Sequence, residues 1–287
     1  MPNFLLKTKN FFLIGLLLLG LNFYVWRNIV YGDGGSPEAG FYFLDVGQGD
    51  SELVVFSSGA KMITDAGPDK RVSSALVGAL GPLDAYVDVA LITHSQMDHY
   101  GGFSELLNRY DFGIFLWNGR SPDLPTREWN DMLKKIKEKN IPMIAVGMGD
   151  KIIFDGDKVE ILSPDKNSLF AKDANESGLV EKISSGGVRG IFTADIGKKT
   201  EAKLINSGFD LSAEILKVGH HGSKYSSGEA FLRAVNPTLA TIEVGKKNRY
   251  GHPTATVLDS LTRIGAEILR TDIFGTVFVR REGEKLL

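Results

Sequence analysis

Apolar and polar positions follow two different periods along residues 41–287. Short runs such as "SELVVF" and "VDVALIT" are apolar or alternating, which is typical of β-strands. Longer stretches such as "RVSSALVGAL" and "TREWNDMLKKIKEKN" place apolar residues three and four positions apart, which predicts amphipathic helices. The two kinds of element alternate through both halves of the chain. We therefore expect one continuous domain with sheets inside and helices outside.

The expected elements cover most of this domain. Strands are expected at 40–46, 51–56, 60–65, 87–93, 113–117, 179–184, 189–195, 213–219, 239–244, 267–271 and 275–281. Helices are expected at 71–80, from near Gly102 to 110, and at 126–140, 198–208, 227–236 and 254–265. Residues 151–163 predict a hairpin that turns at Asp155 and Gly156.

The first residues form a separate unit. Residues 11–26 carry no charge, follow two lysines and end at Arg27. As a helix they would extend for ~24 Å, slightly less than a hydrocarbon core of ~30 Å. We expect a signal anchor over residues 1–31 and a flexible linker over 32–40, before the domain at 41–287. A cleaved signal peptide is the alternative, and in both cases the N-terminal positive charges place the domain outside the cytoplasm.

Composition narrows the chemistry. The 287 residues are 43% hydrophobic, which suits a globular core, and the net charge of -2 provides no global basic field for nucleic acid. The chain has no cysteine, which excludes disulfides, thiolate metal ligands and cysteine nucleophiles. Any metal must be held by histidine, carboxylate or amide groups, which favours zinc, manganese or magnesium.

The histidines gather in loops after predicted strands. The chain has five of them, at positions 94, 99, 220, 221 and 252. In "THSQMDHYGG" a tight loop can direct His94 and Asp98 into one cleft beside His99, although the same loop could merely cap the next helix. Asp195 ends an apolar strand, where a carboxylate is costly unless it meets a cation. Ligands at several strand ends of one sheet converge, so we predict a metal site.

Further charged residues lie beside these loops. Asp45, Asp50 and Asp65 lie at the ends of other predicted strands. Basic residues next to the histidine loops could neutralise phosphates, or they could form an ordinary solvated surface. These basic residues are Lys217, Lys224, Lys246, Lys247 and Arg249.

Six stretches of the chain form a specific combination. They read "FYFLDVGQGDSELV", "MITDAG", "LITHSQMDHYGG", "IFTADI", "LKVGHHGSKYSS" and "VGKKNRYGHPTATVL". Together they resemble the metallo-β-lactamase-fold hydrolases, and most of all the soluble hydrolase domain of ComEC-type competence proteins, which take up DNA across bacterial membranes. The resemblance covers nearly all of the chain after the anchor. It implies an α+β fold, a four-layer αββα sandwich with metals at the open edge between two sheets.

The resemblance also implies roles for single residues. The implied metal ligands are His94, Asp98, His99, Asp195, and His220 or His221. Asp65 resembles an aspartate that orients a ligand, and Asp45 and Gln96 are expected near it behind the ligands. His252 resembles a further histidine that acts as ligand or proton donor. We expect Asp98, His252 and Lys224 to take part in catalysis, and Lys217, Lys224 and Arg249 to contact substrate.

Three positions depart from the family pattern. Gln96 stands where the fold has histidine and the ComEC-like branch often has aspartate. The segment around 175–180 lacks the middle histidine of the fold, and Ala194 replaces a glycine in "TAD". We therefore predict one tight and one weak site for zinc or manganese.

The resemblance favours a membrane-anchored, metal-dependent phosphodiesterase that cleaves DNA during uptake. A separate channel protein is a possible partner. One alternative is a hydrolase of small esters, lactones or amides, because this fold supports many reactions. Another is a degenerate binding module that lost turnover through Gln96.

Overall fold

The computed structural model describes residues 14–25 and 37–287, and its contacts divide the chain into Met1–Glu38 and Ala39–Leu287. Residues 14–25 are helical. Within the described ranges, no helix is both long and apolar enough to span a membrane. The expected anchor over 1–31 and linker over 32–40 fall largely on residues outside those ranges. Membrane anchoring and extracytoplasmic placement therefore stay predictions.

The larger unit contains two seven-stranded sheets. The first has the order β14-β1-β2-β3-β4-β5-β6, with strands β1 (Gly40–Phe43), β2 (Glu52–Val55), β3 (Lys61–Thr64), β4 (Tyr86–Ile92), β5 (Asp111–Trp117), β6 (Met143–Ala145) and β14 (Val277–Val279). Strands β3 to β6 run parallel, whereas β14, β1, β2 and β3 pair antiparallel.

The second sheet repeats this mixture of directions. Its order is β13-β12-β11-β10-β9-β8-β7, with strands β7 (Lys151–Phe154), β8 (Asp157–Ser163), β9 (Val180–Ser185), β10 (Val188–Phe192), β11 (Ile215–Lys217), β12 (Leu239–Ile242) and β13 (Glu267–Arg270). Strands β10 to β13 are parallel and β7 to β10 antiparallel. A small hairpin of β15 (Arg281–Glu282) and β16 (Lys285–Leu286) follows.

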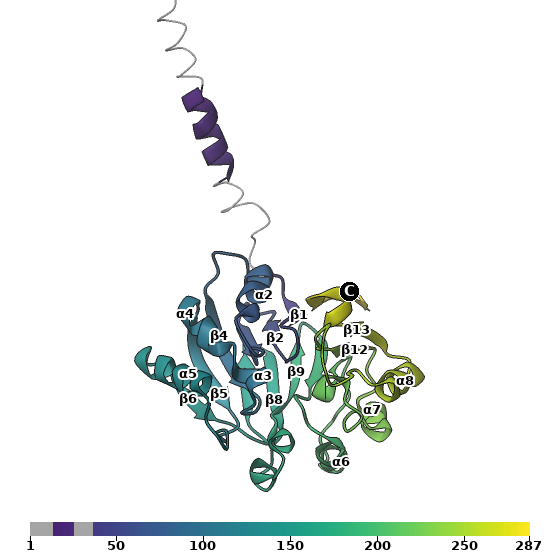
Figure 1. Cartoon of the computed structure of the whole chain (residues 1–287). Coiled ribbons are helices and arrows are strands. Elements are labelled where there is room, and N and C mark those ends of the chain that lie inside the picture. The colour runs from purple at the N-terminus through teal and green to yellow at the C-terminus, as the bar shows by residue number, and fades with distance from the viewer. Residues whose placement is uncertain (1–13, 26–36) are drawn as a thin grey trace, which may run out of the picture. The chain divides into compact units, whose positions relative to one another are not determined.

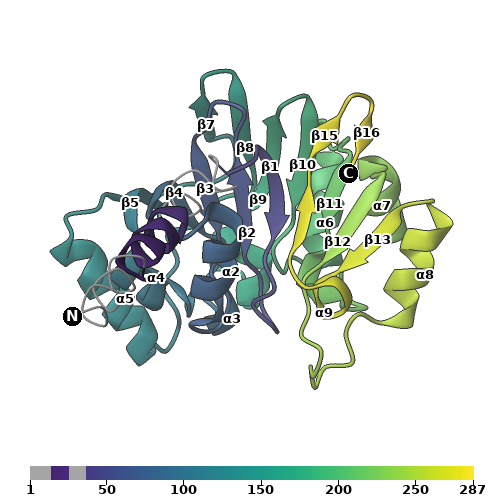
Figure 2. The ribbon, with the colours of Figure 1, turned by 90° about the horizontal axis from the view of Figure 1, so that it is seen from above.

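Helices cover the outer face of each sheet (Figures 1 and 2). On the first sheet these are α2 (Arg71–Leu80), α4 (Phe103–Arg109) and α5 (Arg127–Glu138), and on the second α6 (Lys198–Asn206), α7 (Glu229–Val235) and α8 (Ala255–Arg263). The short helices are α3 (Met97–Tyr100), α9 (Thr271–Phe274), η1 (Ser168–Phe170), η2 (Ala174–Ser177) and η3 (Gly219–Gly222). This arrangement is the predicted α/β sandwich.

Three apolar clusters hold the layers together. One packs α2, α4 and α5 on the first sheet around Phe103, Phe115 and Trp129. The second lies between the sheets and includes Phe43 and Phe192, whose rings meet edge to face at 5.4 Å. The third packs α6, α7 and α8 on the second sheet. Both faces of each sheet are thus buried, which explains the nearly continuous apolar runs of the central strands.

Most expected elements are confirmed, and several short ones are new, among them β6, α3 and α9. The predicted hairpin is formed by β7 and β8, and Asp155 and Gly156 at its turn both have positive φ. The single-turn helix α3 was not predicted by the apolar pattern. It forms because the carbonyl of Gln96 accepts hydrogen bonds from the amides of His99 and Tyr100 at 3.0 and 3.1 Å. Asp98 and His99 therefore lie on a helical turn and not in an extended loop.

A polar contact also joins the two sheets. The Thr64 hydroxyl, at the end of β3, donates to the carboxyl of Glu181 in β9 at 3.1 and 3.2 Å. Both side chains are fully buried. Burial, opposed by the Thr64 hydrogen bond and assisted by the charge of Asp65, raises the pKa of Glu181 to about 8.

This shift predicts a pH-dependent stability. A carboxyl whose folded pKa lies above its unfolded value stabilises the fold fully below about pH 4.5, and this contribution is lost as the pH rises through about 8. Glu181→Gln should remove that dependence, so the variant should gain on wild type by a few kcal/mol between pH 5 and about 8. Urea unfolding across this range measures it, with the exposed Glu138→Gln as control. Parallel pH curves for wild type and Glu181→Gln would contradict the assignment.

Candidate metal centre

The residues of the predicted site follow strands that end at one edge of each sheet. Asp65 follows β3, His94 follows β4, Asp195 follows β10, and His220 and His221 follow β11. Strands β3 and β4 are parallel, as are β10 and β11. Carboxyl ends of neighbouring parallel strands lie at a shared edge, which is the usual place for a binding site in such sheets.

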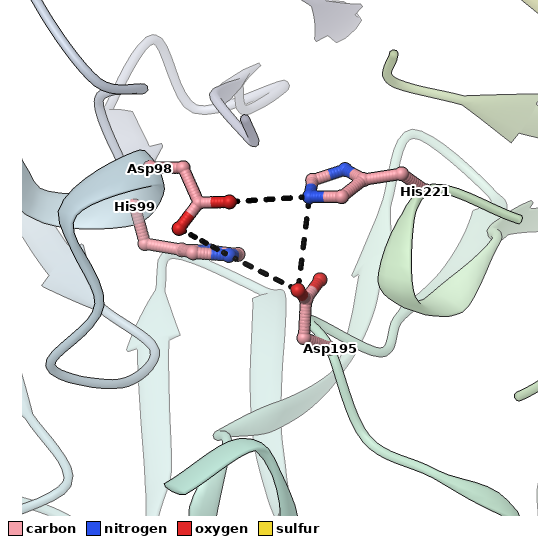
Figure 3. Close-up of side chains that lie close together, drawn as sticks. All are labelled: Asp98, His99, Asp195 and His221. Atoms are coloured by element: carbon pink, nitrogen blue, oxygen red, sulfur yellow. Dashed lines mark ion pairs between the residues drawn. The ribbon is translucent and has the colours of Figure 1, made fainter. Parts of the chain in front are cut away.

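Four side chains of the predicted site converge (Figure 3). Asp98, His99, Asp195 and His221 each offer one ligand atom, and these atoms all lie within 4.8 Å of one another. His99 Nε2 is 3.5 Å from Asp195 Oδ2. His221 Nε2 is 3.5 Å from Asp98 Oδ2 and 3.7 Å from Asp195 Oδ2.

The unsatisfied atoms of this cluster fit a divalent cation. His99 Nε2, His221 Nε2 and Asp195 Oδ1 are buried without a hydrogen-bond partner in the part of the chain that the structure describes. Such atoms are costly unless something meets their lone pairs. A tetrahedral ion with ligands at about 2.0–2.2 Å would separate its ligand atoms by roughly 3.3–3.6 Å. The distances of 3.5 and 3.7 Å come close to this, so the residues present fit a metal ion.

Asp65 orients His99 from behind. His99 Nδ1 lies 2.7 Å from Asp65 Oδ2, and the same carboxylate accepts hydrogen bonds from the Thr93 amide and hydroxyl at 2.9 and 2.6 Å. A donor on Nδ1 leaves the lone pair on Nε2, which faces Asp195. This is the arrangement by which carboxylates fix metal-binding histidines in proteins.

The sequence left His220 and His221 as alternatives, and the structure separates them. Both have left-handed backbones, with φ of 51° and 53°. The ring of His221 is buried, with Nδ1 2.9 Å from the Glu243 carbonyl, and its Nε2 points into the cluster. The His220 side chain is 30% exposed, and its Nε2 lies 3.8 Å from Asp195. His221 is therefore the member of the four-residue cluster.

The electrostatics favour a cation as well. Burial disfavours the ionised form of Asp195, but the charges of His221 and His99 hold its pKa well below the usual range. Burial also opposes ionisation of Asp98, yet its contact with His221 and the charge of His99 lower its pKa to about 2. Both carboxylates are thus ionised at neutral pH. Against the effect of burial, Asp195 and Asp65 raise the pKa of His99, whose proton a bound cation would replace.

Comparison with known proteins settles the family. Residues 44–245 match the model of the "Metallo-beta-lactamase superfamily". The chain belongs to the metallo-beta-lactamase superfamily. The metallo-beta-lactamase fold protein YhfI from Bacillus subtilis superposes with a TM-score of 0.53 at 11% identity, over 81% of this chain and 96% of that one. The predicted fold is confirmed, and so is the class of metal-dependent hydrolase.

Curated relatives of this metallo-beta-lactamase chain include a competence protein. ComE operon protein 3 of Bacillus subtilis (strain 168) is 30% identical over 264 residues, which cover 85% of this chain and 33% of that protein. Competence protein ComA of Neisseria gonorrhoeae is 29% identical over 245 residues, which cover 84% and 32%. The chain thus spans about a third of the length of these relatives. The predicted resemblance to competence proteins is confirmed.

A second group of polar atoms lies beside the cluster. His94 Nε2 is buried without a partner among the described residues, and burial lowers the pKa of His94 to about 4, so its ring is neutral. Asn175 also carries a buried, unpartnered side-chain oxygen, and it lines a cavity of about 370 Å³ with Asp195 and His220. Gln96 is not part of the four-residue cluster. Sequence reasoning did not single out Asn175, although it noted that residues 175–180 replace the middle histidine.

The remaining predicted residues surround these groups. The ring of His252 lies 5.7 Å from that of His220, and burial followed by the charges of His220 and His221 lowers its pKa. Lys224 lines the same cavity as Asp195. Arg249 is on the neighbouring loop, with its guanidinium 5.4 Å from the ring of Tyr250. None of these three belongs to the four-residue cluster among the described residues.

Two predictions are wrong. Lys217 cannot contact substrate, because its side chain is 0% exposed and forms a buried ion pair with Asp50 in the interior of the protein. Asp45 does not lie behind the ligands; its carboxylate accepts from the Gly47 amide at 3.1 Å. Asp50 lies there instead, with Oδ1 3.1 Å from His221 Nδ1. The sequence signal that could have found it is the position of Asp50 directly before the predicted strand at 51–56 and after Gly49.

The ion pair of Lys217 and Asp50 predicts a large stability effect. Lys217→Met leaves Asp50 and the neighbouring Glu52 without a buried cation, so we expect the free energy of unfolding to fall by about 3–5 kcal/mol. Adding Asp50→Asn should restore part of this loss. Denaturant unfolding measures both, with the exposed Lys134→Met as control. A loss no larger than that of Lys134→Met would show that the pair does not stabilise the core.

Proposed function

We propose that this chain hydrolyses phosphodiester bonds of DNA in competence-type uptake. One curated relative, ComA of Neisseria gonorrhoeae, carries competence in its name, although the chain spans about a third of its length. The observation that carries the substrate class is the cavity of about 370 Å³ beside Asp195, which three lysines line. These lysines are Lys198, Lys199 and Lys224.

A phosphodiester backbone suits this cavity better than a neutral small molecule. Lysines beside a reacting centre neutralise phosphates and position the backbone without reading sequence. Asp173 and Glu176 line the same cavity, but Glu176 accepts a hydrogen bond from Thr200. The adjoining loop adds Lys246 and Lys247, which line a further cavity of about 460 Å³. A neutral ester, lactone or amide would gain little from these cations.

The four-residue cluster supports turnover. A bound cation would lower the pKa of its water towards 7 and polarise a phosphoryl oxygen. Asp98, His99, Asp195 and His221 would hold it, and Asp65 keeps His99 in the required tautomer. The lowered pKa of His252 leaves it neutral at pH 7, which suits a proton acceptor or ligand better than a proton donor. The cluster reaches four ligand groups without Gln96, so the proposed tight site does not depend on that residue.

We further propose one tight and one weak site for zinc or manganese. The tight site is the four-residue cluster. The weak site would combine His94 and the shared Asp195 with the amide oxygens of Asn175 and Gln96, which bind these metals weakly. His221→Ala should weaken the tight step by at least about tenfold, because it removes a nitrogen 3.5 Å from Asp98 and 3.7 Å from Asp195. His220→Ala should retain it. Calorimetric titration of metal-free protein measures both, and the reverse ranking would show that the wrong histidine was assigned.

DNA cleavage tests the function directly. The full chain with manganese or zinc should cleave labelled DNA and a phosphodiester dye, and leave a β-lactam intact. Asp98→Asn should lower kcat by at least about a hundredfold through loss of the cation. Replacing Lys198, Lys199 and Lys224 by alanine should raise KM for DNA and flatten its salt dependence. Turnover of the β-lactam without DNA cleavage would overturn the proposal, and a fully active Asp98→Asn would show that the site is elsewhere.

A further inference from the structure

Two tyrosines near the metal centre are exposed to solvent. Tyr225 is 66% exposed and Tyr250 is 56% exposed. A single exposed aromatic ring is ordinary on a protein surface. These two differ because Tyr225 lines a cavity with His220 and Tyr250 is linked to His220 through the ring of His252, on loops that follow different strands of the second sheet.

Tyr225 reaches the centre through the lysine-lined cavity. It follows η3, the turn that carries His220 and His221. It lines the cavity of about 370 Å³ together with Asp195 and His220. Its ring is therefore part of the wall past which a substrate in this cavity would extend.

Tyr250 reaches the centre through a series of ring contacts. Its ring stacks on that of His252, with centroids 5.8 Å apart and planes at 25°. His252 in turn meets His220 at 5.7 Å. The loop is held in place by Asn248, whose side chain pairs with the backbone amide and carbonyl of His252 at 3.0 and 2.8 Å. Tyr250 is thus anchored beside the centre and still open to solvent.

A cationic side chain lies over the ring of each tyrosine. Lys224 Nζ lies 5.1 Å from the ring centroid of Tyr225, and the Arg249 guanidinium carbon lies 5.4 Å from that of Tyr250. Single-stranded nucleic acids are bound by this combination, in which bases stack on aromatic rings and cations neutralise the adjoining phosphates. A duplex keeps its bases stacked inside the helix, where such rings cannot reach them.

We propose that Tyr225 and Tyr250 are stacking sites for unpaired nucleobases next to the reacting phosphodiester. The inference rests on the proposed function and restricts its substrate to single-stranded DNA. Stacking requires only the face of a base, so binding should depend little on base identity. Lys224 and Arg249 then contact phosphates of the bound strand beside the two rings.

Equilibrium binding to oligonucleotides tests this inference. The full chain is titrated, with metal removed by chelator, into a labelled single-stranded oligonucleotide, the same oligonucleotide with abasic residues, and its duplex. Tyr225→Ala and Tyr250→Ala should each weaken binding of the normal strand by roughly 5- to 100-fold. Neither should change binding of the abasic strand. Wild type should bind the normal strand more tightly than the duplex.

Matched variants separate stacking from folding. Tyr225→Phe and Tyr250→Phe keep the ring and should bind like wild type. Tyr86→Ala removes a tyrosine that is 46% exposed at the start of β4, the end of that strand away from the site, and should have no effect. With manganese present, the alanine variants should raise KM for the strand while kcat changes little.

The outcomes distinguish the two proposals. If wild type cleaves DNA but the alanine variants bind normal and abasic strands as wild type does, stacking is refuted and the phosphodiesterase proposal stands. Equal weakening on both strands also refutes stacking, because the loss would then not involve bases. Duplex binding as tight as single-strand binding refutes the strand preference. If wild type neither binds nor cleaves DNA, the proposed function fails and the inference falls with it.

Discussion

Three buried carboxylates, those of Asp50, Asp65 and Asp195, lie close together in space around the ring of His99. The site depends on which groups compensate their negative charge. Burying an ionised carboxylate is strongly unfavourable unless cations or hydrogen-bond donors surround it. Asp50 meets Lys217, and Asp65 meets Thr93 and His99. Asp195 keeps one oxygen without a hydrogen-bond partner among the described residues. Asp50 Oδ1 lacks such a partner as well, but Asp50 Oδ2 is paired with the Lys217 ammonium, whereas Asp195 belongs to the four-residue cluster that fits a metal ion.

The loops that carry these groups hold strained backbones. Asp65, Ala194, His220 and His221 all have positive φ, a conformation that is uncommon for residues other than glycine. Such strain persists only where the surroundings enforce it, and here two packed sheets supply that framework. The amide of His220 donates to the carbonyl of Ala194 at 3.0 Å, so two of the strained turns support each other. Ala194 adopts a conformation that favours glycine, and this turn places the carboxylate of the next residue, Asp195, in the site.

The surroundings of the centre are chemically uneven, and this gives the substrate proposal its direction. Lys198, Lys199 and Lys224 line the cavity beside Asp195, where a polyanion would be attracted in spite of the overall charge of -2. In the proposed function, the lysines of this cavity would act on substrate encounter and positioning, whereas the buried Lys217 affects only the interior. Lys217 and Lys224, which both lie beside the histidine loops in the sequence, are therefore in different surroundings in the structure.

Sequence and tertiary structure contributed different things. Apolar periodicity is a local property of the chain, and by itself it predicted most strands and helices. The resemblance of the sequence motifs to a known family implied the αββα fold and the candidate ligands. The sequence could not choose between His220 and His221, since adjacent residues share every local signal and only the left-handed turn directs one ring into the cluster. It could not place Lys217 or Asp50 either. Lys217 ends β11, which lies between two parallel strands. Its buried partner Asp50 is 167 residues away in the chain. Contacts of that range exist only after the two sheets have packed, which is why the tertiary structure alone decided which charges stay inside and which face a substrate.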